Sequence, residues 1–480
     1  MIRNFNMRQV TICALLLTSA TSCDVLTQDP PTALTQEDGF ANPDRIAKSA
    51  VGMYDALQNA EFLGGRALVY SDLRSDDTNP AVFFGFVSTF NMQANDAIAL
   101  NTWTGGYRSL YGCNYFLQQI AKNPGKTTSV LETQYISEAK FIRALIYFHL
   151  VNLFAQPYNF TPDASHLGVP LQLTAPDAGN AFDASQNLSR STVSQVYAQM
   201  ERDLNDAITG LPETYATPFD RTGRATKDAA RGLLSRIYLY KGQYAEAAAM
   251  ANNVITGTPT RHALNASPAT PFNAASYQTS ESIFSIAMNL SDNPNTNNAL
   301  GQHYGATQRR DITVTPYALL DTATLFRSKD RRRTQLLTPS IFPVPAAVYT
   351  LKYNNASSDY APILRYSEIL LNRAEGLAQT DPGISVEAIS LLNTVRRRSL
   401  PNVAAYANFT AASFANKQAL VDVILHERRL ELAFEGHRYY DLLRNRRNSS
   451  RVNYGDEKAI FPIPQVDLLQ NPNLVKNPGY

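Results

Sequence analysis

Runs of apolar residues at helical spacing are the feature that most constrains the fold of this chain. In the longest run, 130–154, apolar side chains recur every three or four residues. This spacing places them on one side of an α-helix, which must then be buried against a neighbour. The fold class that we predict is therefore mainly α, built from paired helices. Comparable runs occupy 45–60, 103–121, 192–211, 227–257, 365–379, 385–398 and 416–444.

One of these pairs, within 227–259, has the pattern of a tetratricopeptide unit. Such a unit is a helix–turn–helix in which small residues at fixed offsets let the two helices approach closely. The pattern is carried by Leu234, Ser235, Tyr238, Gly242, Tyr244, Ala247, Ala251, Val254 and the closing Pro259. The second helix of another unit recurs at Ala388, Leu392 and Val395. We predict a tetratricopeptide-like scaffold, with two ordinary antiparallel helices as the alternative.

Between the helical runs lie long stretches without helical periodicity. They cover 61–101, 157–190 and 258–337, and a C-terminal segment covers 446–480. They are too long for simple connections and are rich in Tyr, Phe, Asn and Pro. Long irregular segments on a rigid scaffold commonly carry function, so we expect a large irregular ligand-binding half packed on the scaffold. The helix pairs are expected within 41–60, 103–155, 192–257 and 363–445.

The first residues are typical of an export signal. Arg3 and Arg8 precede a short apolar stretch, and small residues then lead to Cys23. Small residues directly before a cysteine resemble a bacterial lipobox, although Ala20 stands where leucine is commonest. We predict a lipoprotein signal peptide over 1–22, a lipidated Cys23 with a flexible tether over 23–40, and a single domain over 41–480. An ordinary signal peptide with an incidental cysteine is the alternative.

Charge and cysteine content exclude several classes of protein. The chain has 43 Lys and Arg against 41 Asp and Glu, so no basic excess exists to hold a nucleic acid. Of the three cysteines only Cys113 lies in the body of the chain, so a disulfide framework is not expected. No later segment has the roughly 20 apolar residues of a membrane span, so any membrane attachment is expected through lipid alone.

Several ordered segments together resemble the SusD/RagB family. The C-terminal pair, His426–Asn445 and Phe461–Tyr480, is similar to the C-terminal signature of that family. The family's internal motifs are matched by Trp103–Gln118, Ser137–Phe154, Arg224–Ala247 and Ile363–Gln379. The resemblance extends from the lipobox to Tyr480.

This resemblance implies a fold, a location and an activity. It implies four tetratricopeptide-like helix pairs that cradle an irregular ligand-binding half. It also implies a lipoprotein on the outer face of an outer membrane, which captures nutrient glycans and closes as a lid over a SusC-like TonB-dependent transporter. Some members of the family take peptides instead, so a peptide-binding member is the first alternative. No catalytic residue and no cofactor are implied.

Eight charged residues in the C-terminal signature could pass for an active site. All are predicted on one helix with opposite charges three or four positions apart. We interpret them as an ion-pair network that locks this helix to the scaffold. They are Glu427, Arg428, Arg429, Glu431, Glu435, Arg438, Asp441 and Arg444.

Motifs for catalysis or metal binding are weak. Ser137 and Lys140 match S-x-x-K, and S-D-N occurs at 291–293, but the K-T-G of penicillin-recognising enzymes is missing. The six histidines are scattered, so we predict no metal site. Asp72, Asp76 and Asp77 could hold calcium, but a solvated loop is the favoured interpretation. A surface hydrolase remains an alternative of another class, because a catalytic carboxylate pair has no sequence signature.

Ligand capture needs only aromatic faces and planar polar side chains in a concave site. By resemblance two regions face the ligand. The first holds Asp77, Asn79, Phe83, Phe84 and Phe86, and the second holds Gln302, Tyr304 and Arg309. Core packing is the alternative for the phenylalanines, and a surface loop is the alternative for Tyr304. The single tryptophan, Trp103, lies in a helix motif, so stacking must use Tyr or Phe, which argues against a starch-like ligand.

Overall fold

A computed structural model describes residues 38–480 except 81, 178, 274–276, 315–327 and 340–346. The signal peptide over 1–22, Cys23 and most of the expected tether lie outside the described residues. The last three residues of the expected tether form a helical turn, and Phe40 is buried against Phe116, with ring centroids 5.5 Å apart. Within the described ranges, no helix combines the length and apolar character of a membrane span.

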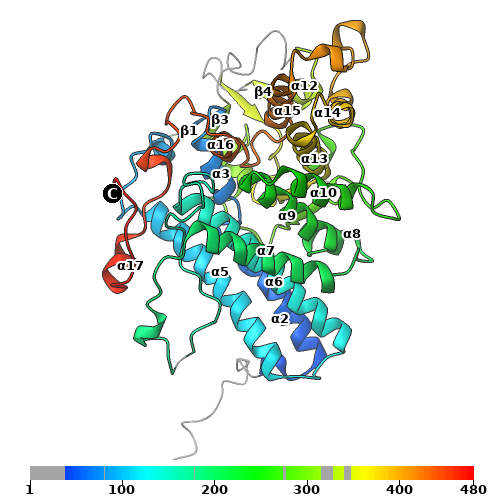
Figure 1. The fold of residues 1–480 in the computed structure, drawn as a ribbon. Helices are drawn as coiled ribbons and strands as arrows, with labels where there is room; N and C mark the ends of the chain where they lie inside the picture. Colours follow the sequence, from blue (N-terminus) through cyan, green and yellow to red (C-terminus); the bar gives the residue numbers. More distant parts are fainter. Residues whose placement is uncertain (1–37, 81, 178, 274–276, 315–327, 340–346) are drawn as a thin grey trace, which may run out of the picture.

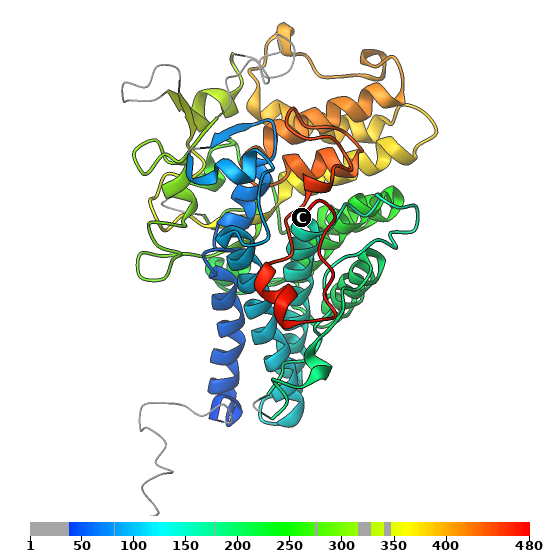
Figure 2. The same ribbon diagram turned by 90° about the vertical axis from the view of Figure 1, so that its left-hand side faces the viewer.

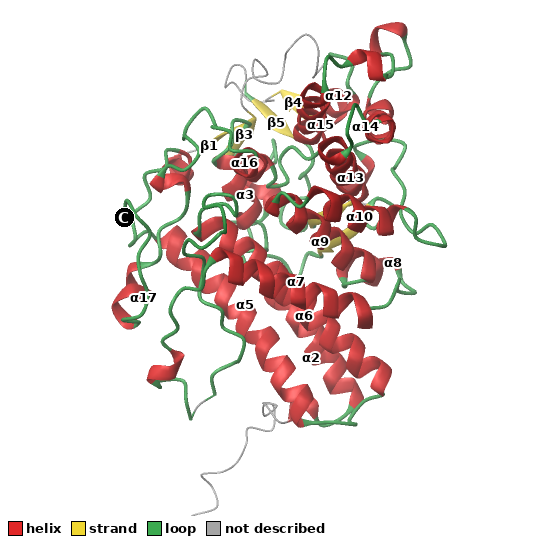
Figure 3. Ribbon diagram, in the orientation of Figure 1, coloured by secondary structure: helices red, strands yellow, loops and turns green. Residues whose placement is uncertain are grey.

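Helices dominate the chain, which confirms the predicted fold class (Figure 3). The α-helices are α2 Pro43–Asp55, α3 Arg66–Leu73, α4 Gly85–Ser88, α5 Ala97–Lys122, α6 Ser129–Phe154, α7 Val193–Gly210, α8 Pro218–Gly223, α9 Lys227–Lys241, α10 Tyr244–Ile255, α11 Leu300–Tyr304, α12 Arg331–Leu336, α13 Tyr366–Thr380, α14 Val386–Ser399, α15 Lys417–Glu431, α16 Arg438–Arg444 and α17 Gln465–Gln470. The strands are β1 Thr78–Pro80, β2 Ser282–Ile286, β3 Ile312–Val314, β4 Leu337–Pro339, β5 Val348–Thr350 and β6 Ala361–Arg365.

The long helices pack as successive antiparallel neighbours on one side of the molecule (Figures 1 and 2). In the predicted tetratricopeptide pair, α9 ends at Gly242, which has a φ of 73° that suits glycine. The Ser235 hydroxyl donates to the Ala247 carbonyl at 2.9 Å across the pair. Helix α13 approaches the same pair closely, since a Cβ on Gly376 would lie 2.5 Å from the Tyr244 carbonyl oxygen. These contacts confirm a tetratricopeptide-like scaffold.

The irregular half lies beside this helical layer (Figure 2). It contains two small antiparallel sheets, with strand orders β1-β3-β5-β4 and β2-β6. The stretch 61–101 is less irregular than predicted, because it contains α3 and the start of α5. All eight residues of α3 are buried, so the segment has no polar face and shows no amphipathic period.

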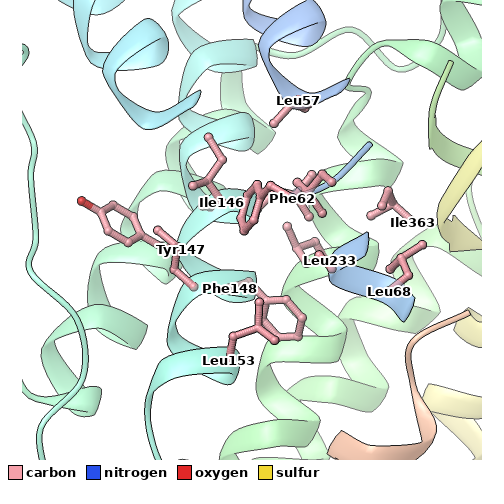
Figure 4. Close-up of a cluster of buried hydrophobic side chains, with 14 of the residues drawn as sticks. Leu57, Phe62, Leu68, Ile146, Tyr147, Phe148, Leu153, Leu233 and Ile363 are labelled. Carbon is pink, nitrogen blue, oxygen red and sulfur yellow. The ribbon is translucent and has the colours of Figure 1, made fainter. Parts of the chain in front are cut away.

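One hydrophobic core joins the helical layer to the irregular half (Figure 4). Helix α6 contributes Ile146, Tyr147, Phe148 and Leu153, and side chains from the N-terminal segment, α9 and β6 pack with them. The C-terminal half of α6 is buried on every side, which is why it reads as a continuous apolar run.

The C-terminal signature is two helices rather than the single helix predicted over 416–444. Helix α15 ends at Glu431, and α16 begins at Arg438. Between them Phe434 and Gly436 have φ angles of 66° and 77°, which a continuous helix cannot accommodate. A Cβ on Gly436 would lie 3.0 Å from the Cα of Leu68, so the turn also packs tightly against α3.

The signature charges form a buried ion-pair network, as predicted, but their partners mostly come from other elements. Arg428 contacts Asp441 at 2.9 Å, and Arg444 contacts Glu375 of α13 at 2.5 Å. Glu431 and Glu435 both contact Arg365, at 3.3 and 2.7 Å. The network therefore ties α15 and α16 to α13 and to the irregular half.

Candidate functional site

Pairing of β1 with β3 brings the two predicted ligand regions together. Asn79 lies opposite Thr313, so the segment after α3 runs beside the segment after α11. These segments are more than 200 residues apart in the chain, and Figure 2 shows them side by side in the irregular half.

Four of the predicted site residues are exposed at this junction. The side chains of Phe83 and Phe86 are 51% and 56% exposed, and Asn79 and Arg309 are also exposed. Exposed apolar side chains that gather on one surface are typical of an interaction site. We name the surface formed by Asn79, Phe83, Phe86 and Arg309 the aromatic shelf.

Buried Arg66 and exposed Asn297 hold the aromatic shelf in place. The Arg66 guanidinium lies 5.2 Å from the centroid of the Phe83 ring and is paired with Glu61 at 2.6 Å. Arg66 also donates to the Asn297 carbonyl at 2.8 Å, and Arg309 donates to the Asn297 side-chain oxygen at 2.7 Å. One asparagine thus links both halves of the shelf. Arg66 was not predicted as a site residue, because nothing in the periodicity of the chain indicates a buried arginine.

The other four predicted site residues are buried, and the prediction of direct ligand contact is corrected for them. The Phe84 ring packs 5.0 Å from His303, and the Tyr304 hydroxyl donates to Asp72 at 2.7 Å. Tyr304 is therefore a core residue, not the surface tyrosine of the alternative interpretation. Their burial depends on contacts with distant segments, which the sequence pattern did not reveal. The four residues, with exposures of 0–5%, are Asp77, Phe84, Gln302 and Tyr304.

The acidic run at 72–77 is not the solvated loop that we favoured, because Asp72 and Asp77 are buried. Asp77 accepts from Arg429 at 2.8 Å, and Asp76 accepts from the Ser450 amide at 2.6 Å. Asp72 accepts from the Gly436 amide at 3.1 Å. Each carboxylate already has a protein partner. The described part of the chain holds no cluster of three or more Asp, Glu, His or Cys suited to a metal.

Asp72 makes the stability of the protein depend on pH. Burial raises the pKa of Asp72 from 3.8 to about 8, while the hydrogen bond from Tyr304 opposes the shift. Because the folded state holds a proton that the unfolded chain releases, the contribution of Asp72 to stability falls as pH rises from about 4 to about 8. Asp72→Asn removes this titration. We expect the free energy of unfolding of the variant, relative to that of the wild type, to rise with pH across that window, and a difference that does not change with pH would contradict the assignment.

A buried histidine and a carboxylate support the Arg309 side of the shelf. His303 Nδ1 lies 2.8 Å from Asp311, which also contacts Arg309 at 3.1 Å. Burial lowers the pKa of His303. Burial alone would raise the pKa of Asp311, but His303 and Arg309 lower it overall. Asp311 is therefore a fixed negative partner for Arg309 and is poorly suited to be a general acid.

A second concavity lies between α2, α8 and β2, with a volume of about 210 Å³. Asp55 and Asp292 both line it, and the Asp292 side chain accepts from Gln58 at 3.1 Å. Burial, followed by the charge of Asp292, raises the pKa of Asp55. Because two carboxylates line one concavity, this pair provides a direct test of the hydrolase alternative. Ser137 offers no such test, because it is buried and its S-x-x-K partner Lys140 pairs with Asp206 at 2.7 Å.

Two family models match this chain. One, described as "Starch-binding associating with outer membrane", matches residues 26–239, and the SusD family model matches residues 346–480. The chain belongs to the SusD family. This SusD-family chain is 24% identical to SusD-like protein P25 of Formosa agariphila, over 98% of the chain and 99% of that protein.

Solved structures of the SusD superfamily share its architecture. A SusD superfamily protein from Bacteroides fragilis matches with a TM-score of 0.79 at 29% identity, covering 91% of this chain and 99% of the other. A putative sugar binding protein from Bacteroides vulgatus matches with a TM-score of 0.78 at 25% identity, covering 91% of this chain and 98% of the other.

Proposed function

We propose that this SusD-family protein captures oligosaccharides at the cell surface through the aromatic shelf. The observation that carries the proposal is the β1–β3 pairing, which sets exposed Phe83 and Phe86 beside Asn79 and Arg309. Sugar rings stack their C–H faces on flat aromatic side chains, while amide and guanidinium groups bond the hydroxyls. Membership of the family, with a model described as starch-binding, supports a glycan as the ligand.

The expected location and partner belong to the same proposal. Lipidation of Cys23 would hold the protein on the outer face of the outer membrane by lipid alone. Closure over a SusC-like TonB-dependent transporter would then carry the bound glycan into the channel. Fractionation of cells that express wild type and Cys23→Ala tests the anchor: we expect wild type in outer-membrane fractions and the variant in soluble fractions.

Phe83→Ala is expected to weaken glycan binding about tenfold, because the variant removes a ring that is already ordered by Arg66. Affinity electrophoresis of residues 24–480 against a panel of polysaccharides measures the effect. Phe160→Ala serves as the control, because it removes a ring that is 41% exposed and outside the shelf. Equal retardation of both variants would argue against the shelf as the ligand site.

Two other experimental outcomes would change the proposed ligand class or the proposed activity. Retention of peptides alone in a pulldown from a tryptic digest would keep the lid role and move the ligand to the peptide class. Turnover of a bound glycan by wild type, lost in Asp292→Asn, would favour the hydrolase alternative. We expect no turnover at the shelf itself, because the carboxylates next to it, Asp77 and Asp311, are paired with Arg429 and Arg309.

A further inference from the structure

A groove on the helical face of the molecule is separate from the aromatic shelf. It has a volume of about 560 Å³ and lies between the outer face of α5, the loop over 170–188 and the C-terminal helix α17. This volume is within the range of ordinary ligand pockets. Figures 1 and 2 show α17 beside α5, away from the strands that carry the shelf.

The floor of the groove is aromatic. Tyr111 is 40% exposed, and its ring is stacked on Tyr115 with centroids 6.0 Å apart and planes inclined by 15°. Tyr107 and Trp103 continue the same face of α5 one and two turns toward its N-terminus. The hydroxyl of Tyr107 donates to the Pro170 carbonyl at 2.9 Å, so the loop is anchored to the aromatic floor.

The walls of the groove carry planar polar groups. Gln186 and Asn187 come from the loop, and Gln470 comes from α17. The only charged side chains among the described lining residues are Arg108 and Asp467, which balance each other. Arg108 is exposed and forms no ion pair with a described residue, so its donors face the groove's solvent. Burial raises the pKa of Asp467, and a hydrogen bond from the Trp103 side chain opposes this shift.

We infer that this groove is a second binding site, for a neutral oligosaccharide. The exposed ring of Tyr111 suits the C–H face of a sugar, and amide, guanidinium and carboxylate groups at the rim suit its hydroxyls. The balance of Arg108 and Asp467 gives no preference for a charged ligand. A polymer held at both the groove and the shelf would dissociate more slowly than from either site alone.

The single tryptophan provides a readout specific to this site. Trp103 lines the groove, and the chain has no other tryptophan, so its fluorescence reports on the groove and not on the shelf. The probes are neutral hexasaccharides of glucose, mannose, galactose and xylose. We expect at least one to change the Trp103 emission of residues 24–480 in a saturable manner, in both wild type and Phe83→Ala. Tyr111→Ala should weaken that binding about fivefold or more, with Phe160→Ala unchanged.

Asp467→Asn tests the same site without removing a ring, since the amide oxygen retains an acceptor for Trp103. We expect this variant to bind the hexasaccharide more weakly, with an unchanged melting temperature. Failure of every hexasaccharide to change the emission would overturn the inference. Emission changes that Phe83→Ala abolishes and Tyr111→Ala spares would overturn it too, while leaving the shelf proposal intact. Glycan binding equal to wild type in Tyr111→Ala, with loss of a protein partner, would instead identify the groove as a docking surface.

Discussion

Replacing Arg365 with Met is expected to lower the free energy of unfolding by about 3–5 kcal/mol. The guanidinium of Arg365 contacts Glu281 at 2.5 Å and Glu435 at 2.7 Å. All three side chains are at most 3% exposed. Met retains most of the side-chain volume but removes one buried counter-charge, so that Glu281 keeps only Arg398 and Glu435 keeps only Lys352 in an interior that solvates ions poorly. Chemical denaturation of both proteins at neutral pH measures the difference.

Arg373→Met is the matched control. Arg373 pairs with Glu387, whose side chain is 53% exposed, so we expect a loss of no more than about 1 kcal/mol. The pH dependence provides a second readout. In Arg365→Met the buried carboxylates outnumber their remaining cations and take up protons in the folded state more readily than in the unfolded chain, so the variant should regain stability as pH falls toward about 5. Similar losses in both variants, without this recovery, would contradict a buried network.

Phe284→Ala is expected to lower the free energy of unfolding by about 3–5 kcal/mol, through the loss of buried apolar surface and the cavity that remains. Phe284 is fully buried on β2, and its ring lies 5.0 Å from Phe141 of α6 and 6.3 Å from Tyr54 of α2. This contact joins the irregular half to the helical layer. The variant therefore tests whether the two halves unfold as one cooperative unit.

The control for this variant is Phe182→Ala, since the ring of Phe182 is fully exposed. We expect its stability to remain within about 0.5 kcal/mol of wild type. Denaturant titrations followed by circular dichroism and by Trp103 fluorescence should give coincident transitions in wild type. A small effect of Phe284→Ala, or separate transitions in wild type, would show that the irregular half is not held by this core.

The elements that local sequence predicts well are those with strong periodicity or special backbone demands. Helices α6, α9, α10 and α14 match the predicted runs with no more than one residue outside them, because each buries one face or one half against a neighbour. The end of α9 was also predicted from a local feature, because Gly242 follows the helix and its φ of 73° suits glycine. The break at Gly436 was missed, because the charges around it continue a helical spacing across the turn.

The composition of the ligand regions was also readable from the sequence, but the orientation of each side chain was not. Phe83, Phe84 and Phe86 are the same residue type in one short segment. Phe84 is nevertheless buried against His303, while Phe83 and Phe86 are exposed. Tyr304 is a core residue because Asp72, 232 positions away, accepts its hydroxyl. Neither outcome has a local signature, since both depend on segments that meet only after folding.

The sequence by itself determined the helical class, the paired scaffold and the family, because helix periodicity and motif order are properties of neighbouring residues. Only the tertiary structure decided which side chains form a surface. The pairing of Asn79 with Thr313 assembles the aromatic shelf from two distant segments, and the packing of α17 beside α5 forms the groove at Tyr111. Burial and the partners of buried charges are set by contacts between distant segments, and a single sequence does not encode these as a local pattern.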